Sequence, residues 1–506
     1  MRILTKLEWD KRTIVVAAIL ILALATAIRF YHIDWTFSSN GIDEGIMLER
    51  AQMVSRGYLP YAGLPLDQAP LSFLIGGEIW GDVVLLRAFA ASLSVLAVAA
   101  CMEAARRIRG NYAMLVTGVL LALDFAFLRE TRTFSLNGLS SSVTAISFLF
   151  FVIYFQKGSR TMLVLSGLVI GIAASMKLFG ALGFAGMAFF LGVELLRSPR
   201  TRKRGSVDLA LMSASAAIPL ILLMAYLGPS EMIRGMVLDQ GHRAFEPFQK
   251  LGLLAYFGTN LAYLLPLAYV RKIWRLGPEI RFLLCAAGVM LVFMIVEPLM
   301  FYHHLVMLSP ALAVLAGVFV SGLIVRRNEQ LKRISPHDGS EKGFTLWRAS
   351  MAATTIGLLV SSGLAAYGIV AQGETTQQVV AKRIAEITGA DDWIVSGDPT
   401  ISAFANRQTP PTLINLAFRQ YPDITLDDLE DGILENNVSV VIQAYRLNTM
   451  DGLGDFLSSH GYTIVSRDFF GYGDDIAIYT FNEQVEPLTF YVRDDIVSSL
   501  GLPVPA

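Results

Sequence analysis

Eleven stretches of this chain are apolar over roughly the length that a membrane-spanning helix requires. A bilayer core of about 30 Å needs roughly 20 apolar residues of helix to cross it. The stretches lie near residues 13–31, 82–104, 112–128, 138–156, 161–176, 178–196, 207–227, 251–270, 280–298, 304–325 and 349–371. The fifth and sixth are short and are separated only by Lys177-Leu178, so their division is the least distinct. The pattern predicts a polytopic α-helical membrane protein with about 11 transmembrane helices.

Lysine and arginine gather in every second loop between these stretches. The basic loops are residues 106–109, 157–160, 197–204, 271–275 and 326–333, and the N-terminal segment is basic as well. Because basic loops stay on the cytoplasmic side of a membrane, the alternation predicts a multi-pass cell-membrane protein with a cytoplasmic N-terminus. Residues 32–81, residues 228–250 and the C-terminal tail are then expected to be extracytoplasmic.

The first of these outer segments, residues 32–81, has a pattern of its own. Apolar side chains recur at helical spacing over residues 43–56, which predicts an amphipathic helix lying in the membrane interface. Gly57-Tyr58-Leu59-Pro60 then interrupts the helix, and a second short helix is expected from Pro70 to Trp80.

Beyond residue 372 the pattern becomes that of a water-soluble α/β domain. Strands are expected at residues 393–396, 438–442, 463–466 and 476–481, and helices at residues 375–388, 426–435 and 451–459. We therefore predict a transmembrane domain at 1–372, whose outer loop 32–81 carries an acidic motif, and a soluble extracytoplasmic domain at 373–506.

Composition supports the membrane assignment and excludes one class of partner. The chain is 54% hydrophobic and 16% charged, whereas soluble domains carry about 25% charged residues. Its net charge of -1 argues against nucleic acid as a partner, because phosphate binding needs a basic surplus. The two cysteines lie inside apolar stretches, so no disulfide framework or thiol metal site is indicated.

The acidic motif is Asp43-Glu44, which follows the first apolar stretch by about a dozen residues. Such a pair could be solvated surface charge. It lies, however, at the start of a predicted helix, where the positive end of the helix dipole keeps carboxylates ionised. The motif Asp67-Gln68-Ala69-Pro70 follows it and returns the chain toward the membrane. These features favour a functional acidic site at the outer face.

Several motifs in order resemble those of the GT-C glycosyltransferases, more narrowly the branch of protein mannosyltransferases and aminoarabinose transferases. The matching segments are Gly41-Ile42-Asp43-Glu44 with Arg50, Gly57-Tyr58-Leu59-Pro60-Tyr61, Asp67-Gln68-Ala69-Pro70-Leu71, residues 167–177, and Tyr302-His303-His304-Leu305 with residues 310–313. The resemblance covers about 370 residues in spacing and topology. It implies a GT-C-like fold and an enzyme.

What the resemblance implies is a sugar transfer from a polyprenyl-phosphate donor to an acceptor at the outer face. The reaction is an inverting displacement that needs a base for the acceptor hydroxyl and positive groups for the departing phosphate. By resemblance Asp43 is the base and Glu44 orients it or the acceptor. The candidate residues for binding substrate and phosphate are Arg50, Asp67, Lys177, His242, Arg243, His303 and His304.

Two positions depart from the family pattern. The lysine that usually follows the acid of the second motif is Gln68 here, so another cation must contact the phosphate. Asn137 stands about where the family often has a second acid, which leaves a second catalytic carboxylate unassigned. The acids and scattered histidines form no metal-ligand spacing. No cofactor is therefore indicated, although a divalent metal stays open because family members differ in metal use.

Two other functions remain open at this point. A transporter or flippase of lipid-linked sugars would place ionisable residues near the middle of several helices and repeat one half of the chain, and neither pattern is found. A non-catalytic membrane protein that binds a glycan or a partner would have no need of Asp43-Glu44. The sequence does not identify the donor sugar, the polyprenyl carrier, or whether the acceptor is protein, lipid or polysaccharide.

Overall fold

The computed structural model describes residues 10–37, 43–197, 202–238, 246–333, 341–414, 424–471, 479–480, 483–484 and 488–505. The chain forms two compact units. The first, here called the membrane unit, comprises residues 1–31, 88–223 and 244–371. The second, here called the loop-and-tail unit, comprises residues 32–87, 224–243 and 372–506. The loop after the first helix therefore groups with the C-terminal tail.

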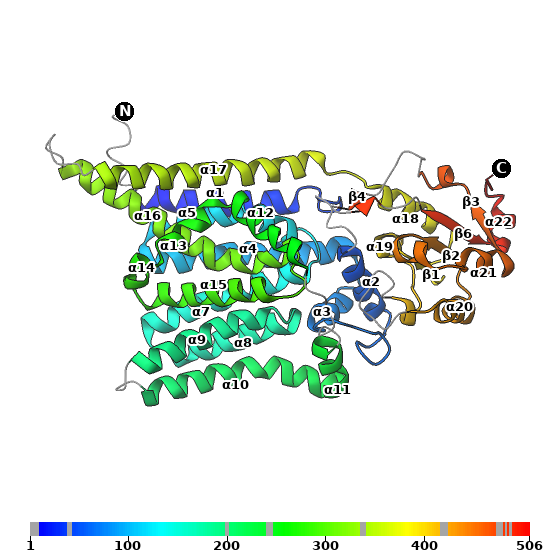
Figure 1. The fold of residues 1–506 in the computed structure, drawn as a ribbon, viewed down its shortest axis with the longest axis horizontal. Coiled ribbons are helices and arrows are strands. Elements are labelled where there is room, and N and C mark those ends of the chain that lie inside the picture. Colours follow the sequence, from blue (N-terminus) through cyan, green and yellow to red (C-terminus); the bar gives the residue numbers. More distant parts are fainter. Residues whose placement is uncertain are drawn as a thin grey trace. The chain divides into compact units, whose positions relative to one another are not determined.

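The apolar stretches all form helices (Figure 1). In chain order these are α1 (Lys11–Phe30), α4 (Val83–Arg109), α5 (Asn111–Ala122), α6 (Phe125–Thr131), α7 (Leu136–Lys157), α8 (Arg160–Met176), α9 (Gly180–Arg197), α10 (Arg202–Leu227), α12 (Leu251–Thr259), α13 (Leu264–Ala268), α14 (Val270–Ile273), α15 (Pro278–Val296), η6 (Tyr302–Leu308), α16 (Ser309–Arg333) and α17 (Glu341–Ala371).

Seven helices in the described part of the chain are long and apolar enough to cross a membrane. The count reaches nine if two bent helix pairs, α5 with α6 and α12 with α13, each form one span. The remaining two predicted segments are the shorter apolar helices α8 and α9. The polytopic α-helical fold is confirmed, with seven to nine candidate spans where the sequence pattern predicted about eleven.

The bend between α5 and α6 has a local cause in Asp124. Its carboxylate caps α6 by accepting a hydrogen bond of 3.2 Å from the backbone N–H of Phe127. It also accepts hydrogen bonds from the Tyr263 hydroxyl at 2.9 Å and the Asn260 amide at 3.2 Å, both from the other bent pair. A buried carboxylate needs such partners, so Asp124 connects the two breaks in the membrane unit.

Small and hydroxylated residues allow the neighbouring helices α7 and α8 to approach closely (Figure 1). The Ser140 hydroxyl donates to the Ala173 carbonyl of α8 at 2.9 Å, and the Ser147 hydroxyl donates to the Ser166 carbonyl at 2.8 Å. Close backbone approach and hydroxyl bridges of this kind are typical of helix packing inside membranes.

The loop-and-tail unit contains several shorter helices and a mixed sheet. The helices are α2 (Asp43–Ser55), α3 (Leu71–Glu78), α11 (Pro229–Ile233), α18 (Thr376–Ile387), α19 (Pro399–Ala405), α20 (Leu426–Glu435), α21 (Leu453–Ser459) and α22 (Asp494–Leu500). The sheet strands are β1 (Ile394–Ser396), β2 (Val440–Gln443), β3 (Tyr462–Val465) and β6 (Thr489–Arg493), in the spatial order β1-β2-β6-β3.

Both faces of this sheet are covered by helices (Figure 1). Strand β1 runs parallel to β2, and β6 pairs antiparallel with both β2 and β3. Because side chains alternate along a strand, Phe490 and Val492 of β6 pack in the core beneath α18 and α19, while Tyr491 packs with α20 and α21. The C-terminal region is therefore an α/β layer with two cores.

The expected strands at 393–396, 438–442 and 463–466 correspond to β1, β2 and β3. The expected strand at 476–481 is described only in part. Its described residues, 479–480, form β4 (Tyr479–Thr480), which pairs with β5 (Glu483–Gln484), and the others lie outside the described residues. The central position belongs to β6, which the sequence pattern did not predict.

Candidate functional site

The acidic motif opens helix α2, and its two carboxylates have different surroundings. Asp43 is half-buried, whereas Glu44 is only 5% exposed. Both oxygens of Glu44 accept hydrogen bonds from the Arg87 guanidinium, Nε to Oε1 and Nη2 to Oε2, each at 2.8 Å. This two-point pairing fixes the orientation of the carboxylate as well as its charge. Glu44 is thus held in place, while Asp43 keeps access to solvent.

Arg87 also organises the chain that leads into α2. Its Nη1 donates to the backbone carbonyls of Ile33, Asp34 and Trp35 at 3.0–3.1 Å. The guanidinium carbon lies 5.3 Å from the ring centroid of Phe404, on helix α19. Sequence reasoning missed Arg87, because a single arginine at the start of an apolar stretch is usually a flanking charge. Only the fold reveals its partner 43 positions away.

Arg50 and Asp67, two of the predicted substrate-binding residues, pair with one another. Arg50 Nη1 lies 2.9 Å from Asp67 Oδ1, and the two side chains are 0% and 3% exposed. The guanidinium also lies 5.8 Å from the ring centroid of Phe73 on α3. The Gln68 amide is 3.5 Å from the second oxygen of Asp67. This pair connects α2 to the segment that leads into α3.

The interior of α2 differs from the expected amphipathic interface helix. Nine of its 13 residues are buried, including the charged Glu49 and Arg50. Helix α3 and helix α19 cover it, so the polar positions of the helix face protein and find partners there. The Gln52 amide, for example, donates to the Ala403 carbonyl of α19 at 2.8 Å.

Glu49 is a buried acid on this helix whose pKa is shifted. It accepts a hydrogen bond from the Thr409 hydroxyl. Burial raises the pKa of Glu49 to about 7, although the hydroxyls of Thr409 and Ser402 and the charge of Arg50 act in the opposite direction. Nearby Asp398 contributes to the increase. Desolvation dominates because the carboxyl is almost wholly removed from water.

Helices α2 and α19 also meet through their backbones. A Cβ atom on Gly45 would lie 2.4 Å from the backbone nitrogen of Thr400, so only glycine fits there. At the other end of α2, the Arg56 guanidinium donates to the carbonyl and side-chain oxygens of Asn406, both at 2.9 Å. We call this set the α2–α19 contact, and it holds the acid-bearing helix against the tail.

The membrane unit brings together another three of the predicted residues. Lys177 directly follows α8 as its C-cap residue, and its Nζ lies 5.0 Å from the ring centroid of Phe179. The Phe179 ring packs edge-on against His304 at 4.8 Å, and His304 lies 4.5 Å from His303. Phe301 stacks on His303 at 5.3 Å. We call these five residues the basic-aromatic cluster.

Arg129 of α6 lies near the same cluster. Its guanidinium is 5.9 Å from the Tyr302 ring centroid, and its Nε is 3.8 Å from Glu130. Glu130 accepts a hydrogen bond from the Ser135 hydroxyl at 2.6 Å. By contrast, Arg132 donates to backbone carbonyls of α1 and the residue that follows it, which is a structural arrangement. The cluster and Arg129 supply positive charge on aromatic surroundings, a chemistry suited to an anionic head group.

The remaining predicted residues, His242 and Arg243, lie outside the described residues. Within the residues that the structure describes, no group of three or more His, Cys, Asp or Glu side chains is arranged to hold a metal ion. Asn137, at the place of the family's second acid, is buried in α7.

Comparison with known proteins finds a family model that resembles part of the chain. Residues 75–229 match the family model described as Dolichyl-phosphate-mannose-protein mannosyltransferase, abbreviated PMT. No curated protein sequence matches the chain. The match covers 155 of the 506 residues, so it shows that this part of the chain is similar to the PMT family.

Solved structures share the fold over nearly the whole chain. ArnT from Cupriavidus metallidurans, bound to undecaprenyl phosphate, is 17% identical with a TM-score of 0.66, covering 96% of this chain and 99% of that one. The oligosaccharyltransferase AglB from Archaeoglobus fulgidus, in complex with an inhibitory peptide and a dolichol-phosphate, is 13% identical with a TM-score of 0.56, covering 97% and 77%.

These findings confirm the predicted family resemblance and the predicted fold class.

Proposed function

We propose that this protein transfers a sugar from a polyprenyl-phosphate donor to an acceptor at the outer membrane face, with inversion at the anomeric carbon and Asp43 as the base. The observation that supports this assignment is the contrast within the acidic motif. Both oxygens of Glu44 are engaged by Arg87, whereas the Asp43 side chain is half-buried at the first position of α2. A base must reach the acceptor hydroxyl, and Asp43 is the member of the pair with that access.

The proposed chemistry follows from this position. Asp43 removes the proton of the acceptor hydroxyl. At the same time the hydroxyl oxygen forms a bond to the anomeric carbon, and the bond between that carbon and the carrier phosphate breaks. The N-terminus of α2 favours the ionised carboxylate before the reaction. Glu44 acts as a positioning residue, because its pairing with Arg87 fixes the first turn of the helix on which Asp43 lies.

For the departing phosphate we propose Lys177, His303 and His304 of the basic-aromatic cluster. A lysine and two imidazoles supported by Phe179 and Phe301 can donate hydrogen bonds to phosphate oxygens. The donor class is supported by the relatives that carry undecaprenyl phosphate and a dolichol-phosphate.

Arg50 and Asp67 are better suited to holding the loop, since each is buried and paired with the other. The roles of His242 and Arg243 as phosphate contacts remain predictions. The cytoplasmic position of the N-terminus and the extracytoplasmic position of the tail also remain predictions.

Complementation of a deletion strain tests the base. Asp43→Asn keeps the size of the side chain but removes the basic oxygen, and loss of a general base lowers the rate by roughly 10²–10⁴-fold. We therefore expect mass spectrometry to show accumulated polyprenyl-linked sugar and no product glycan in this strain. Glu78→Gln, which changes an exposed acid on α3 of the same unit, is the matched control and should complement fully.

The membrane level and melting temperature of each variant must equal those of the wild type for the comparison to hold. Normal product glycan from Asp43→Asn under those conditions would remove Asp43 as the base. Accumulation of the same donor in both variant strains, relative to wild type, would instead point to a general loss of function.

A further inference from the structure

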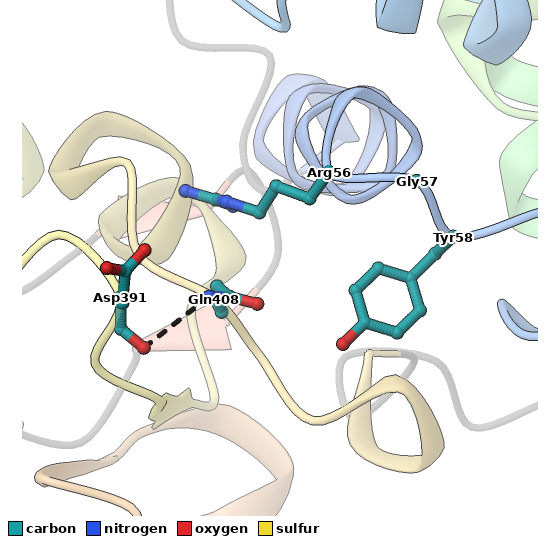
Figure 2. A pocket seen from close by; sticks show the side chains of 5 residues that line it. All are labelled: Arg56, Gly57, Tyr58, Asp391 and Gln408. Carbon is teal, nitrogen blue, oxygen red and sulfur yellow. Dashed lines mark hydrogen bonds between the residues drawn. The ribbon is translucent and has the colours of Figure 1, made fainter.

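The loop-and-tail unit contains an open pocket at the end of α2 that is remote from the acidic motif. Its volume is about 390 Å³, and its lining comes from the loop after α2 and from two positions of the tail. Arg56, Gly57 and Tyr58 follow α2, while Asp391 and Gln408 flank strand β1. Figure 2 shows the Arg56 and Tyr58 side chains extending from the loop toward Asp391 and Gln408 of the tail.

The chemistry of the lining indicates a neutral, hydroxyl-rich ligand. The guanidinium of Arg56 only donates hydrogen bonds and the carboxylate of Asp391 only accepts them, whereas the Gln408 amide and the Tyr58 hydroxyl do both. A simple anion would be repelled by Asp391, and a simple cation by Arg56. A lining that contains both hydrogen-bond donors and acceptors fits adjacent hydroxyl groups, because each hydroxyl can donate and accept. The opposite charges of Arg56 and Asp391 cancel, which fits a neutral ligand.

An aromatic wall completes this composition. The Tyr58 ring packs edge-on against Trp393 at 6.4 Å between centroids, with an interplanar angle of 77°. Such a pair fixes the Tyr58 ring in one orientation. A fixed ring offers an apolar face for the C–H side of a sugar, next to polar groups for its hydroxyls.

The pocket is also preorganised. Two hydrogen bonds of 2.9 Å to Asn406 hold the Arg56 guanidinium. The Gln408 amide donates to the Asp391 carbonyl at 3.4 Å, the dashed line in Figure 2, and the Gln408 carbonyl accepts from Ile394 at 2.8 Å. Gly57 has a φ of +97°, which lets the chain turn out of α2 and place Tyr58. Groups held in advance lose less entropy when a ligand binds.

The pocket is distant from Asp43, the proposed base. Asp43 and the pocket lie at opposite ends of α2, a helix of 13 residues, which spans about 20 Å at 1.5 Å per residue. A ligand in the pocket is therefore too far away to be the group that loses its proton to Asp43.

We propose that this pocket is a subsite for a neutral saccharide portion of the acceptor, distant from the hydroxyl that reacts. The proposal rests on the proposed transferase function and narrows the acceptor to a molecule that carries a glycan extending along α2. A short peptide or a simple lipid hydroxyl would leave the pocket empty.

Ligand-observed NMR on the purified full-length protein in detergent tests this subsite independently of catalysis. The probes are maltohexaose, mannohexaose and galactohexaose at millimolar concentration. We expect saturation transfer from the wild type to at least one of them. The paired substitution Tyr58→Ala with Asp391→Ala should weaken that binding by roughly tenfold or more, the effect of losing about 1.4 kcal/mol.

Two further variants separate this proposal from the proposed function. Asp431→Ala removes an exposed acid of α20 and should bind as the wild type does. Asp43→Asn should also bind normally, because the base is at the far end of α2. Equal binding by the Tyr58/Asp391 variant, or no transfer to any probe from the wild type, would overturn the subsite. Normal transferase activity of Asp43→Asn would overturn only the assignment of the base.

Discussion

Replacing Glu49 by glutamine should change how the stability of the protein depends on pH. Glutamine has the same shape as a protonated glutamic acid and can still accept the hydrogen bond that Thr409 donates. It cannot ionise. The substitution therefore isolates one quantity, which is the free energy of placing a charged carboxylate between α2 and α19.

Whether the stability rises or falls with pH follows from the direction in which the pKa of Glu49 is shifted. Burial raises the pKa of Glu49 from an ordinary 4.5 to about 7. Between these values the folded protein keeps a proton that the unfolded chain releases, so stability falls as the pH rises. The stabilisation is complete below pH 4.5 and is lost as the pH passes through 7. At about 1.4 kcal/mol per pKa unit, the loss totals about 3 kcal/mol.

The expected result is a difference that depends on pH. At pH 5 the melting temperatures of the Glu49→Gln variant and the wild type should nearly coincide. At pH 8 the variant should melt about 6–12 °C higher, since 1 kcal/mol shifts the midpoint of a unit of this size by about 2–4 °C. Intrinsic fluorescence during heating, in detergent at half-unit pH steps from 4.5 to 8.5, measures this directly.

Glu435→Gln serves as the control, because Glu435 is an exposed acid at the end of α20. It should follow the wild type at every pH. The reasoning is refuted if the difference between Glu49→Gln and the wild type is the same at pH 5 and pH 8, since a constant difference would mean that Glu49 does not titrate between them.

Three other substitutions test the remaining contacts. Gly45→Ala should destabilise the loop-and-tail unit by about 3 kcal/mol and reduce transfer, because its Cβ would press on the backbone of Thr400 rather than on a movable side chain; a melting curve like that of wild type would contradict this. Arg87→Met should cost about 3–5 kcal/mol by leaving Glu44 charged and buried, and Arg87→Met combined with Glu44→Leu should recover much of that loss if the pair is the cause. Lys177→Met should weaken binding of added polyprenyl phosphate without altering the melting temperature, and unchanged binding would remove Lys177 from the phosphate site.

Much of the membrane unit could be predicted from sequence because the signal is local. Each apolar stretch can be recognised within a window of about 20 residues, and all eleven are helical. The break at Lys177-Leu178 was visible for the same reason, since it separates α8 from α9. The number of full spans was harder to predict from the sequence. The bends of 62° in the α5–α6 pair and 95° in the α12–α13 pair depend on long-range contacts such as that of Asp124 with Tyr263.

The parts that escaped prediction are those that long-range contacts determine. Strand β6 is central only because β2 and β3 pair with it from either side, and its five residues carry no turn signal that separates them from α22. Helix α2 was read as amphipathic because its charged residues suggested a solvated face. Arg50 and Glu49 are instead buried because Asp67 and Thr409, far along the chain, meet them there.

The two buried ion pairs of this unit, Arg87 with Glu44 and Arg50 with Asp67, are a poor means of gaining stability. Desolvating two charges costs several kcal/mol per ion, and well-packed apolar residues would often serve as well. Such pairs instead fix the orientation of the elements that they join, because a two-point or tightly enclosed contact permits only one arrangement of the two side chains. Both pairs fix α2, one at the turn that carries Asp43 and the other a helical turn and a half further on. A base that must meet a hydroxyl within hydrogen-bonding distance gains more from such orientation than from added stability.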